Sequence, residues 1–205
     1  MTKTLPRLFT SLLLLAFSAC GPGPAPIACK GYLVDKSVEQ KVNSKIGAFH
    51  RKAQSFMDFK IYENDSLTWD SHQTEKVRDQ CITMTTLDGD TINIVVFLGM
   101  SAGFGYQIAL FRDTCMVVHF AKSDAEIYKL RENDSLEFGV NVPCKHYTLT
   151  LSEKPNFKKG QVLNGVVDLD SENYFEVANG TEKRCRVQLT GYFRTDPVES
   201  LYIGE

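Results

Sequence analysis

The strongest constraint on the fold is a two-residue alternation of apolar and polar side chains near the C-terminus. Within residues 184–195, one side of this pattern carries Cys185, Val187, Leu189, Gly191 and Phe193. The positions between them carry Arg184, Arg186, Gln188, Thr190 and Tyr192. Because successive side chains of a strand point to opposite faces, the segment is predicted to be a half-buried strand with Cys185 on the core side.

Turn signals separate further segments of the same period. Asp88-Gly89 favours a tight hairpin turn because both residues tolerate positive φ, and Asn179-Gly180 is a second such signal. The predicted strands are 82–87 with 90–97, 108–111 with 115–120, 136–140 with 147–151, and then 162–169 and 174–178. Roughly eight to ten short strands indicate an all-β, mainly antiparallel sandwich or barrel-like domain. The βαβ rhythm of a doubly wound sheet is not seen.

One N-terminal segment has a helical period instead. Apolar residues recur at steps of three or four at Val38, Val42, Ile46, Phe49, Ala53 and Phe56. Ser37 and Gln40 have the spacing of a capping box. The pattern predicts one amphipathic helix, although Gly47 inside it costs about 1 kcal/mol relative to alanine. A loop followed by a strand is the alternative.

A short repeat raises the question of internal duplication. The pentapeptide at 63–67, Glu-Asn-Asp-Ser-Leu, recurs at 132–136. It could record two related β halves near 29–120 and 121–205. We favour the simpler interpretation that Asn-Asp-Ser is good turn chemistry used twice, because the surrounding sequences differ. Residues 29–205 are then predicted to form one β-sandwich-like domain.

The first twenty residues form an export signal. Lys3 and Arg7 give a basic start, residues 8–17 are an apolar core, and small residues lead into Cys20. A membrane-spanning helix needs about 20 apolar residues, so this core is too short to span. A basic front, a short apolar core and a small-residue exit are typical of a secretory signal that is removed.

The sequence Phe17-Ser18-Ala19-Cys20 resembles the lipobox of bacterial lipoproteins, with Phe17 where leucine is commoner. The resemblance covers residues 1–20 only. It implies cleavage of a signal peptide (1–19) and acylation of Cys20 by a diacylglycerol and usually a further chain such as palmitate. Glycine rather than aspartate follows Cys20, and no acidic run is near it. The implied location is the cell envelope, on the periplasm-facing side of the outer membrane.

Residues 20–28 are rich in glycine and proline. Alternating proline keeps such a segment extended but jointed, so it is predicted to be a tether between lipid and domain. The net charge of −2 becomes −4 once Lys3 and Arg7 leave with the signal. This balance argues against a nucleic-acid partner. The expected partners are the bilayer, through acylated Cys20, and an unknown envelope protein or glycan.

The chain has six cysteines, of which five remain if Cys20 is acylated. Disulfides form in the periplasm, but an odd number leaves at least one thiol unpaired within the chain. The spacing does not indicate a C-x-x-C site, and the alternative to disulfides is that several cysteines are small buried apolar residues. The candidate disulfide cysteines are Cys29, Cys81, Cys115, Cys144 and Cys185, with the pairing left open.

One motif suggests catalysis. Residues 99–103 match G-x-S-x-G and follow an apolar strand, as the nucleophile elbow of an α/β-hydrolase does. Candidate triad partners downstream of Ser101 are His119, His146, Asp113 and Asp124. However, residues 103–105 are a poor helix start, and a strand pattern follows. A glycine-rich bend between strands is the favoured interpretation.

Two further patterns are weaker. Asp168, Asp170 and Glu172 alternate as in a calcium loop, but the expected glycine and final glutamate are absent, so a solvated turn is predicted. The four histidines are far apart in sequence, and we expect neither a metal site nor a cofactor.

Three segments share the form Asp, then Ser or Thr, then an aliphatic residue. This form resembles a general O-glycosylation motif of some bacterial envelope proteins, with Ser66, Thr91 and Ser135 as the candidate sites. Such sites must be exposed.

The sequence therefore favours a membrane-anchored envelope lipoprotein with a noncatalytic binding or structural role. The alternatives are an envelope serine hydrolase that uses Ser101, and an accessory or inhibitor subunit of an envelope complex.

Overall fold

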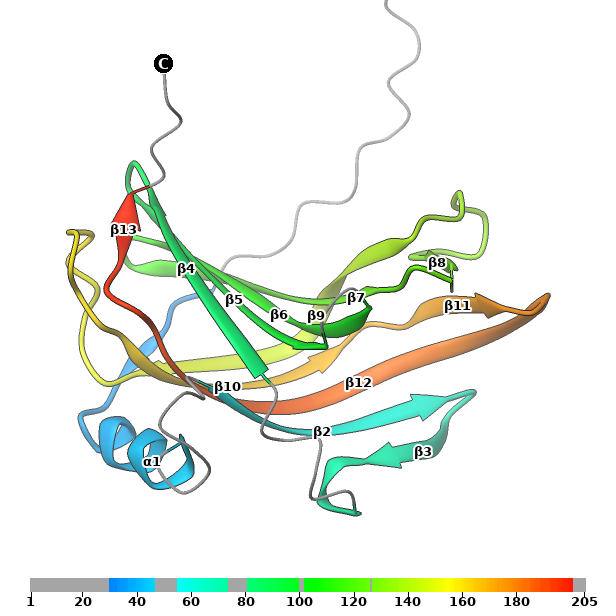
Figure 1. Cartoon of the computed structure of the whole chain (residues 1–205), viewed down its shortest axis with the longest axis horizontal. Helices are drawn as coiled ribbons and strands as arrows, with labels where there is room; N and C mark the ends of the chain where they lie inside the picture. The colour runs from blue at the N-terminus through cyan, green and yellow to red at the C-terminus, as the bar shows by residue number, and fades with distance from the viewer. Residues whose placement is uncertain (1–29, 47–54, 74–80, 100–101, 126, 201–205) are drawn as a thin grey trace, which may run out of the picture.

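The computed structural model describes residues 30–46, 55–73, 81–99, 102–125 and 127–200. Within these residues, thirteen strands form one continuous hydrogen-bonded sheet that folds into two facing layers (Figure 1). All but two of the strand pairs are antiparallel, the exceptions being β1 with β9 and β13 with β4. The prediction of an all-β, mainly antiparallel, sandwich-like domain with one N-terminal helix is confirmed.

The first layer, called layer A, is a meander. Neighbouring strands pair in the order β4 (Cys81–Asp88), β5 (Thr91–Gly99), β6 (Gly103–Phe111) and β7 (Thr114–Lys122). The short strand β13 (Glu199–Ser200) runs parallel to β4 at the outer edge. Buried and more exposed residues alternate along β5, as a strand with one face in the core requires.

The second layer, called layer B, has the long strand β12 (Thr181–Arg194) at its centre. One edge of β12 pairs with β2 (Ser55–Glu63), which in turn pairs with β3 (Ser66–Asp70). The other edge of β12 pairs with two strands in succession. Its C-terminal part pairs with β10 (Asn164–Ser171), and its N-terminal part pairs with β11 (Tyr174–Ala178). Two short strands complete the layer, β8 (Ile127–Lys129) against β11 and β1 (Leu33–Val34) against β9.

Strand β9 (Gly139–Leu151) belongs to both layers. Its first residues pair with β7 in layer A, and the residues from Cys144 onward pair with β10 in layer B. The prediction of two separate strands, 136–140 and 147–151, was wrong here. The strand continues through Pro143, which lacks an N–H group, because this proline lies where the strand leaves layer A.

Helix α1 (Ser37–Ile46) packs on the outer side of layer B. Its buried residues are Val38, Val42 and Ile46, as the helical period predicts, and they contact Val166 of β10. Phe56 was predicted to be on this helix and instead lies in β2. Residues 47–54, which include the predicted positions Phe49 and Ala53, lie outside the described part.

Two hairpin turns follow the turn chemistry of the sequence. In the β11–β12 hairpin, Asn179 and Gly180 have φ of 51° and 75°. In the β4–β5 hairpin, Asp88 pairs with Thr91, so the central residues are Gly89 and Asp90. The turn is thus one residue later than the Asp88-Gly89 signal suggested, and Gly89 supplies the positive φ.

The core lies between the two layers. It combines inward residues of β5, β6 and β7 with residues of β9, β10 and β12. The layers approach closely where Tyr106 of β6 lies against Gly191 of β12: an added Cβ at Gly191 would be 2.5 Å from the Tyr106 Oη. A larger residue at position 191 would therefore collide with this buried ring.

Strands of the two sequence halves, 29–120 and 121–205, are interleaved. Strand β2 pairs with β12, and β7 pairs with β9. The described residues also contain no helix long and apolar enough to span a bilayer.

Candidate functional site

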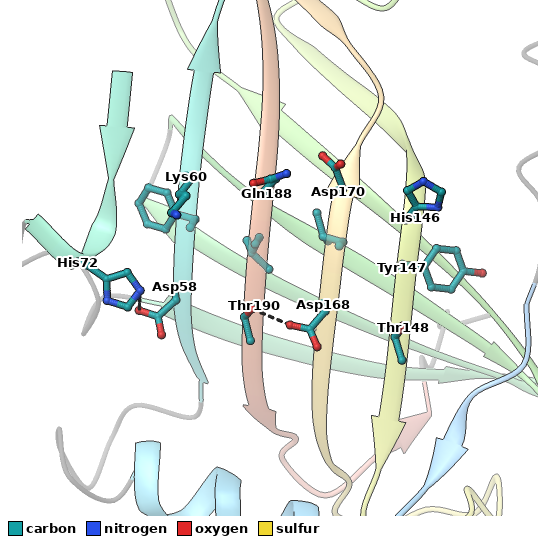
Figure 2. Close-up of a pocket in the computed structure, with 13 residues that line it drawn as sticks. Asp58, Lys60, His72, His146, Tyr147, Thr148, Asp168, Asp170, Gln188 and Thr190 are labelled. Carbon is teal, nitrogen blue, oxygen red and sulfur yellow. Dashed lines mark hydrogen bonds and ion pairs between the residues drawn. The ribbon is translucent and has the colours of Figure 1, made fainter. Parts of the chain in front are cut away.

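A groove of about 420 Å³ crosses the outer side of layer B (Figure 2). It is formed by β2, β12, β10 and β9, together with the short helix η1 (Ser71–Gln73) that follows β3. The polar side chains that line it are Asp58, Lys60, His72, His146, Thr148, Asp168, Asp170, Gln188 and Thr190. We call this surface the layer B groove.

The register of the sheet arranges most of these side chains in two rows across the four strands. One row follows the pairing of Lys60 with Gln188, of Gln188 with Asp170, and of Asp170 with His146. The other row runs Asp58, Thr190, Asp168 and Thr148 by the same pairings. Directly opposite residues in neighbouring strands have Cβ atoms about 5 Å apart. The groove therefore presents a two-row lattice of polar groups on a rigid backbone.

Hydrogen bonds within the groove fix several of these groups. Thr190 Oγ1 donates to Asp168 Oδ1 over 2.6 Å. At one end, Arg186 Nη1 donates to both carboxylate oxygens of Asp170, at 3.0 and 3.1 Å. The Arg186 guanidinium also lies 4.5 Å from the ring centre of Tyr62, whose hydroxyl donates to Gln188 Oε1. This leaves the Gln188 amide nitrogen available as a donor to a ligand.

The β3 side of the groove is held by η1. Ser71 is buried, and its hydroxyl accepts the Phe59 N–H of β2 over 2.8 Å. Asp70 Oδ1 accepts the backbone N–H of His72 over 2.9 Å, which fixes the backbone at the start of η1. The His72 Nε2 lies 3.8 Å from Asp58 Oδ1, which faces it from β2 (Figure 2).

Helix α1 forms the other end of the groove. Lys45 Nζ lies 3.9 Å from Asp58 Oδ2 and 5.2 Å from the ring centre of Phe56. The same amine is 5.5 Å from the ring centre of Tyr192, the next outward residue of β12. The helix thus covers the apolar part of the layer B surface and leaves the polar part open.

The structure corrects the interpretation of residues 168–172. Asp168 and Asp170 are not on a solvated turn, because β10 extends to Ser171. Leu169 lies between the two aspartates, Ser171 follows them, and both of these residues are buried. The two aspartates therefore point outward into the groove. The alternation of Val167 and Leu169 with acidic residues is the sequence signal that could have located them.

The residues of the hydrolase motif lie in a hairpin. Gly99 and Gly103 are paired residues of β5 and β6, and Ser101 lies outside the described part of the chain. A strand therefore follows the motif, where a nucleophile elbow needs a helix. The proposed triad partners are dispersed: His119 is in the core, His146 is in the groove, and Asp113 is in a turn, 2.6 Å from Lys154 Nζ.

The four cysteines in the described residues, Cys81, Cys115, Cys144 and Cys185, form no disulfide with one another. Burial raises the pKa of both Cys144 and Cys185 to about 12. The nucleophilic form of cysteine is the thiolate, so these two thiols are inert at neutral pH. Cys20 and Cys29 lie outside the described residues. The same residues contain no cluster of histidine, cysteine and acidic side chains suited to a metal ion.

The three candidate glycosylation sites are all at turns or loops. Ser66 is exposed at the start of β3, and Thr91 is half-buried at the start of β5. Ser135 is exposed in the loop before β9, where it lines a second hollow of about 630 Å³.

His119 is a completely buried histidine between the layers. Its Nδ1–H donates to the Gly105 carbonyl over 2.9 Å, and its Nε2 has no hydrogen-bond partner in the described residues. The rings of Tyr174 and Phe104 pack against it, with centroids 5.6 and 6.2 Å away. Burial lowers the pKa of His119 to about 4, so the folded protein holds it neutral.

This buried imidazole predicts acid sensitivity. Unfolding restores a pKa near 6.5, so the unfolded chain binds a proton that the folded chain excludes. The free energy of unfolding is therefore highest above the pKa of His119 in the unfolded state. It falls as the pH decreases toward the pKa of His119 in the folded state. From about pH 7 to about pH 5, the free energy of unfolding should fall by about 2 kcal/mol through this group. Urea denaturation of His119→Leu should show a flatter pH dependence than that of the original chain over this range.

Comparisons of the chain with known protein families, with curated proteins and with solved structures found no match. The groove and the signal sequence are therefore the features of the chain that bear on its function.

Proposed function

We propose that this protein is a membrane-anchored cell-envelope lipoprotein that binds a glycan noncatalytically in the layer B groove. The observation that carries the proposal is the two-row lattice of polar side chains on an open sheet surface. The export signal and Cys20 supply the envelope location, and residues 20–28 supply a spacer that holds the domain off the lipid.

The groove has the chemistry that recognises neighbouring hydroxyl groups. Asp168 accepts one hydrogen bond from Thr190 and has further acceptor positions. The Gln188 amide and the Thr148 hydroxyl provide donors from the adjacent strands. A sugar hydroxyl both donates and accepts, so it is satisfied by such alternating groups.

The charges of the groove favour an uncharged or weakly charged ligand. The carboxylates of Asp58 and Asp170 lie beside Lys45 and Arg186, respectively. Lys60 of β2 adds a further positive charge to the groove. With three carboxylates beside three cations, the groove has no net positive charge, so a nucleic acid or another polyanion would lose hydration without a compensating attraction. A glycan satisfies the same groups without this cost.

Binding can be measured with soluble envelope oligosaccharides, namely peptidoglycan fragments and lipopolysaccharide core oligosaccharides. We expect saturable binding by the mature domain in calorimetric titration. Asp168→Asn combined with Gln188→Ala should weaken it by about tenfold or more, since hydrogen bonds to a charged group contribute about 1.5–3 kcal/mol. Both changes are at outward positions and should leave the melting temperature nearly unchanged.

Asp88→Asn is the matched control, because Asp88 is an exposed carboxylate at a turn of layer A, away from the groove. It should bind as tightly as the original chain. Equal affinity for the double variant would contradict the proposed site. If no oligosaccharide binds and one stoichiometric protein partner protects the groove from solvent exchange, the protein is an accessory subunit instead.

A further inference from the structure

The outer side of layer A is unusually apolar for an exposed sheet face. Six of its outward side chains are large and apolar: Ile82, Met84, Val95, Phe97, Met116 and Phe120. The other outward positions between the strand ends of β4–β7 hold no charged residue. Ile82 is 47% exposed and Met84 is 54% exposed. Such a continuous patch usually marks an interaction surface.

Aromatic packing makes the centre of this face smooth. Phe97 and Phe120 both pair with Gly105, from the two neighbouring strands. Their rings stack over that glycine with centroids 5.8 Å apart and planes 15° from parallel. The two rings cover the gap that a residue without a side chain would leave at Gly105.

This face lies opposite the layer B groove. The groove and helix α1 are on the outer side of layer B, and the core separates the two layers (Figure 1). A partner that covers the outer side of layer A would leave the groove open to a ligand.

The chain approaches the domain at the edge of layer A. Lys30, the first described residue, exchanges two backbone hydrogen bonds with Cys115 at the start of β7. Met116, one of the apolar outward residues, directly follows Cys115. Only nine residues, 21–29, lie between Cys20 and Lys30, and the ten steps along the chain span at most about 35 Å when fully extended. An anchor at Cys20 therefore keeps the bilayer within reach of this face at a high effective concentration.

We propose that the outer side of layer A docks on the lipid bilayer that carries the Cys20 anchor, and that the groove then faces away from the membrane. The proposal rests on the proposed anchoring for its geometry. Aliphatic and phenylalanine side chains bury in the interface, and the absence of charge on the face lets it approach lipid without desolvating an ion.

Vesicle binding by an unacylated chain tests the face separately from the anchor. The mature chain with Cys20→Ser should float with phosphatidylcholine vesicles, and added salt should have little effect because the contact is apolar. Ile82→Thr with Met84→Thr puts β-branched residues, which suit a strand, at both positions of β4 and should reduce the partition coefficient by about fivefold or more. Leu67→Thr is the matched control, because Leu67 is 48% exposed on β3 of layer B.

Fluorescence quenching tests the orientation. Trp69 is the single tryptophan of the chain and lies on β3. In vesicles of brominated phosphatidylcholine, Trp69 should remain unquenched, whereas Met84→Trp in a Trp69→Phe background should be quenched.

Several results would overturn the docking proposal. The first is that the unacylated chain does not bind vesicles. The second is that Trp69 alone is quenched. The third is that the chain forms a dimer, which the β4 double variant dissociates while vesicle binding is unchanged. The last result would assign the face to a second copy of the chain. If the protein is not a lipoprotein, lipid labelling at Cys20 should be absent. Vesicle binding by the unacylated chain should be the same in either case.

Discussion

Gly191→Val is expected to lower the free energy of unfolding by about 3 kcal/mol or more, because it forces two packed layers apart. Gly191 is in the middle of β12, paired with Val167 and Met57, where glycine would normally weaken a strand. An added Cβ would lie 2.5 Å from Cε1 and 2.6 Å from Cζ of Tyr106. The Tyr106 ring is completely buried in the core, so it has little room to move. Chemical denaturation of purified protein measures the loss.

A compensating change identifies the collision as the cause. Tyr106→Leu alone should also destabilise the protein, since it leaves a cavity between the layers. Combined with Gly191→Val it should be less harmful than the sum of the two changes, because the valine fills that cavity. Gly139→Val is the control, since an added Cβ there meets its nearest atom at 3.4 Å. Additive effects of the two core changes would show that position 191 does not depend on Tyr106.

The alternation of residues 184–195 was sufficient to predict β12 and the inward side of Gly191. It did not explain why that position is glycine, because the reason is Tyr106, which lies 85 positions earlier in the chain. Period and turn chemistry are local properties of a sequence. Contacts between layers depend on which strands face each other, and this is set by the whole topology.

The same limit explains the errors around β2 and β9. The apolar residue Phe56 continues the helical spacing of α1 by coincidence, and it packs beneath that helix from β2 instead. Strand β9 was divided into two segments in the prediction, whereas it continues through Pro143, which lacks a ladder donor. In the fold this proline pairs with Val118 at the point where β9 leaves β7, so the missing donor costs little.

The groove was only partly accessible to sequence reasoning. The alternation of Asp168 and Asp170 with Val167, Leu169 and Ser171 is visible in the sequence and places both carboxylates on one face of a strand. Their neighbours, Gln188 and Thr190 on one side and His146 and Thr148 on the other, come from β12 and β9. No local pattern predicts this register, which brings distant segments into one lattice.

Cys20→Ala is expected to abolish lipid attachment completely, which is the largest functional effect predicted for this chain. The thiol of Cys20 is the atom that would bear the diacylglycerol, and alanine offers no equivalent. In cells supplied with labelled palmitate, the variant should incorporate no label and should accumulate as uncleaved precursor. Cys29→Ala is the matched control, because it removes the other cysteine near the tether and should leave labelling and cleavage intact.

The consequence for location follows from the energetics of acyl chains. Each buried methylene contributes about 0.8 kcal/mol, and one chain alone binds only marginally, so two or three chains make the attachment stable. The acylated protein should therefore fractionate with the outer membrane even at high salt. Normal cleavage of Cys20→Ala after Ala19, with release of a soluble domain, would identify an ordinary secretory signal. The layer B groove and the buried His119 would be unaffected by that result, whereas docking of layer A would lose the tether that makes a weak apolar contact effective.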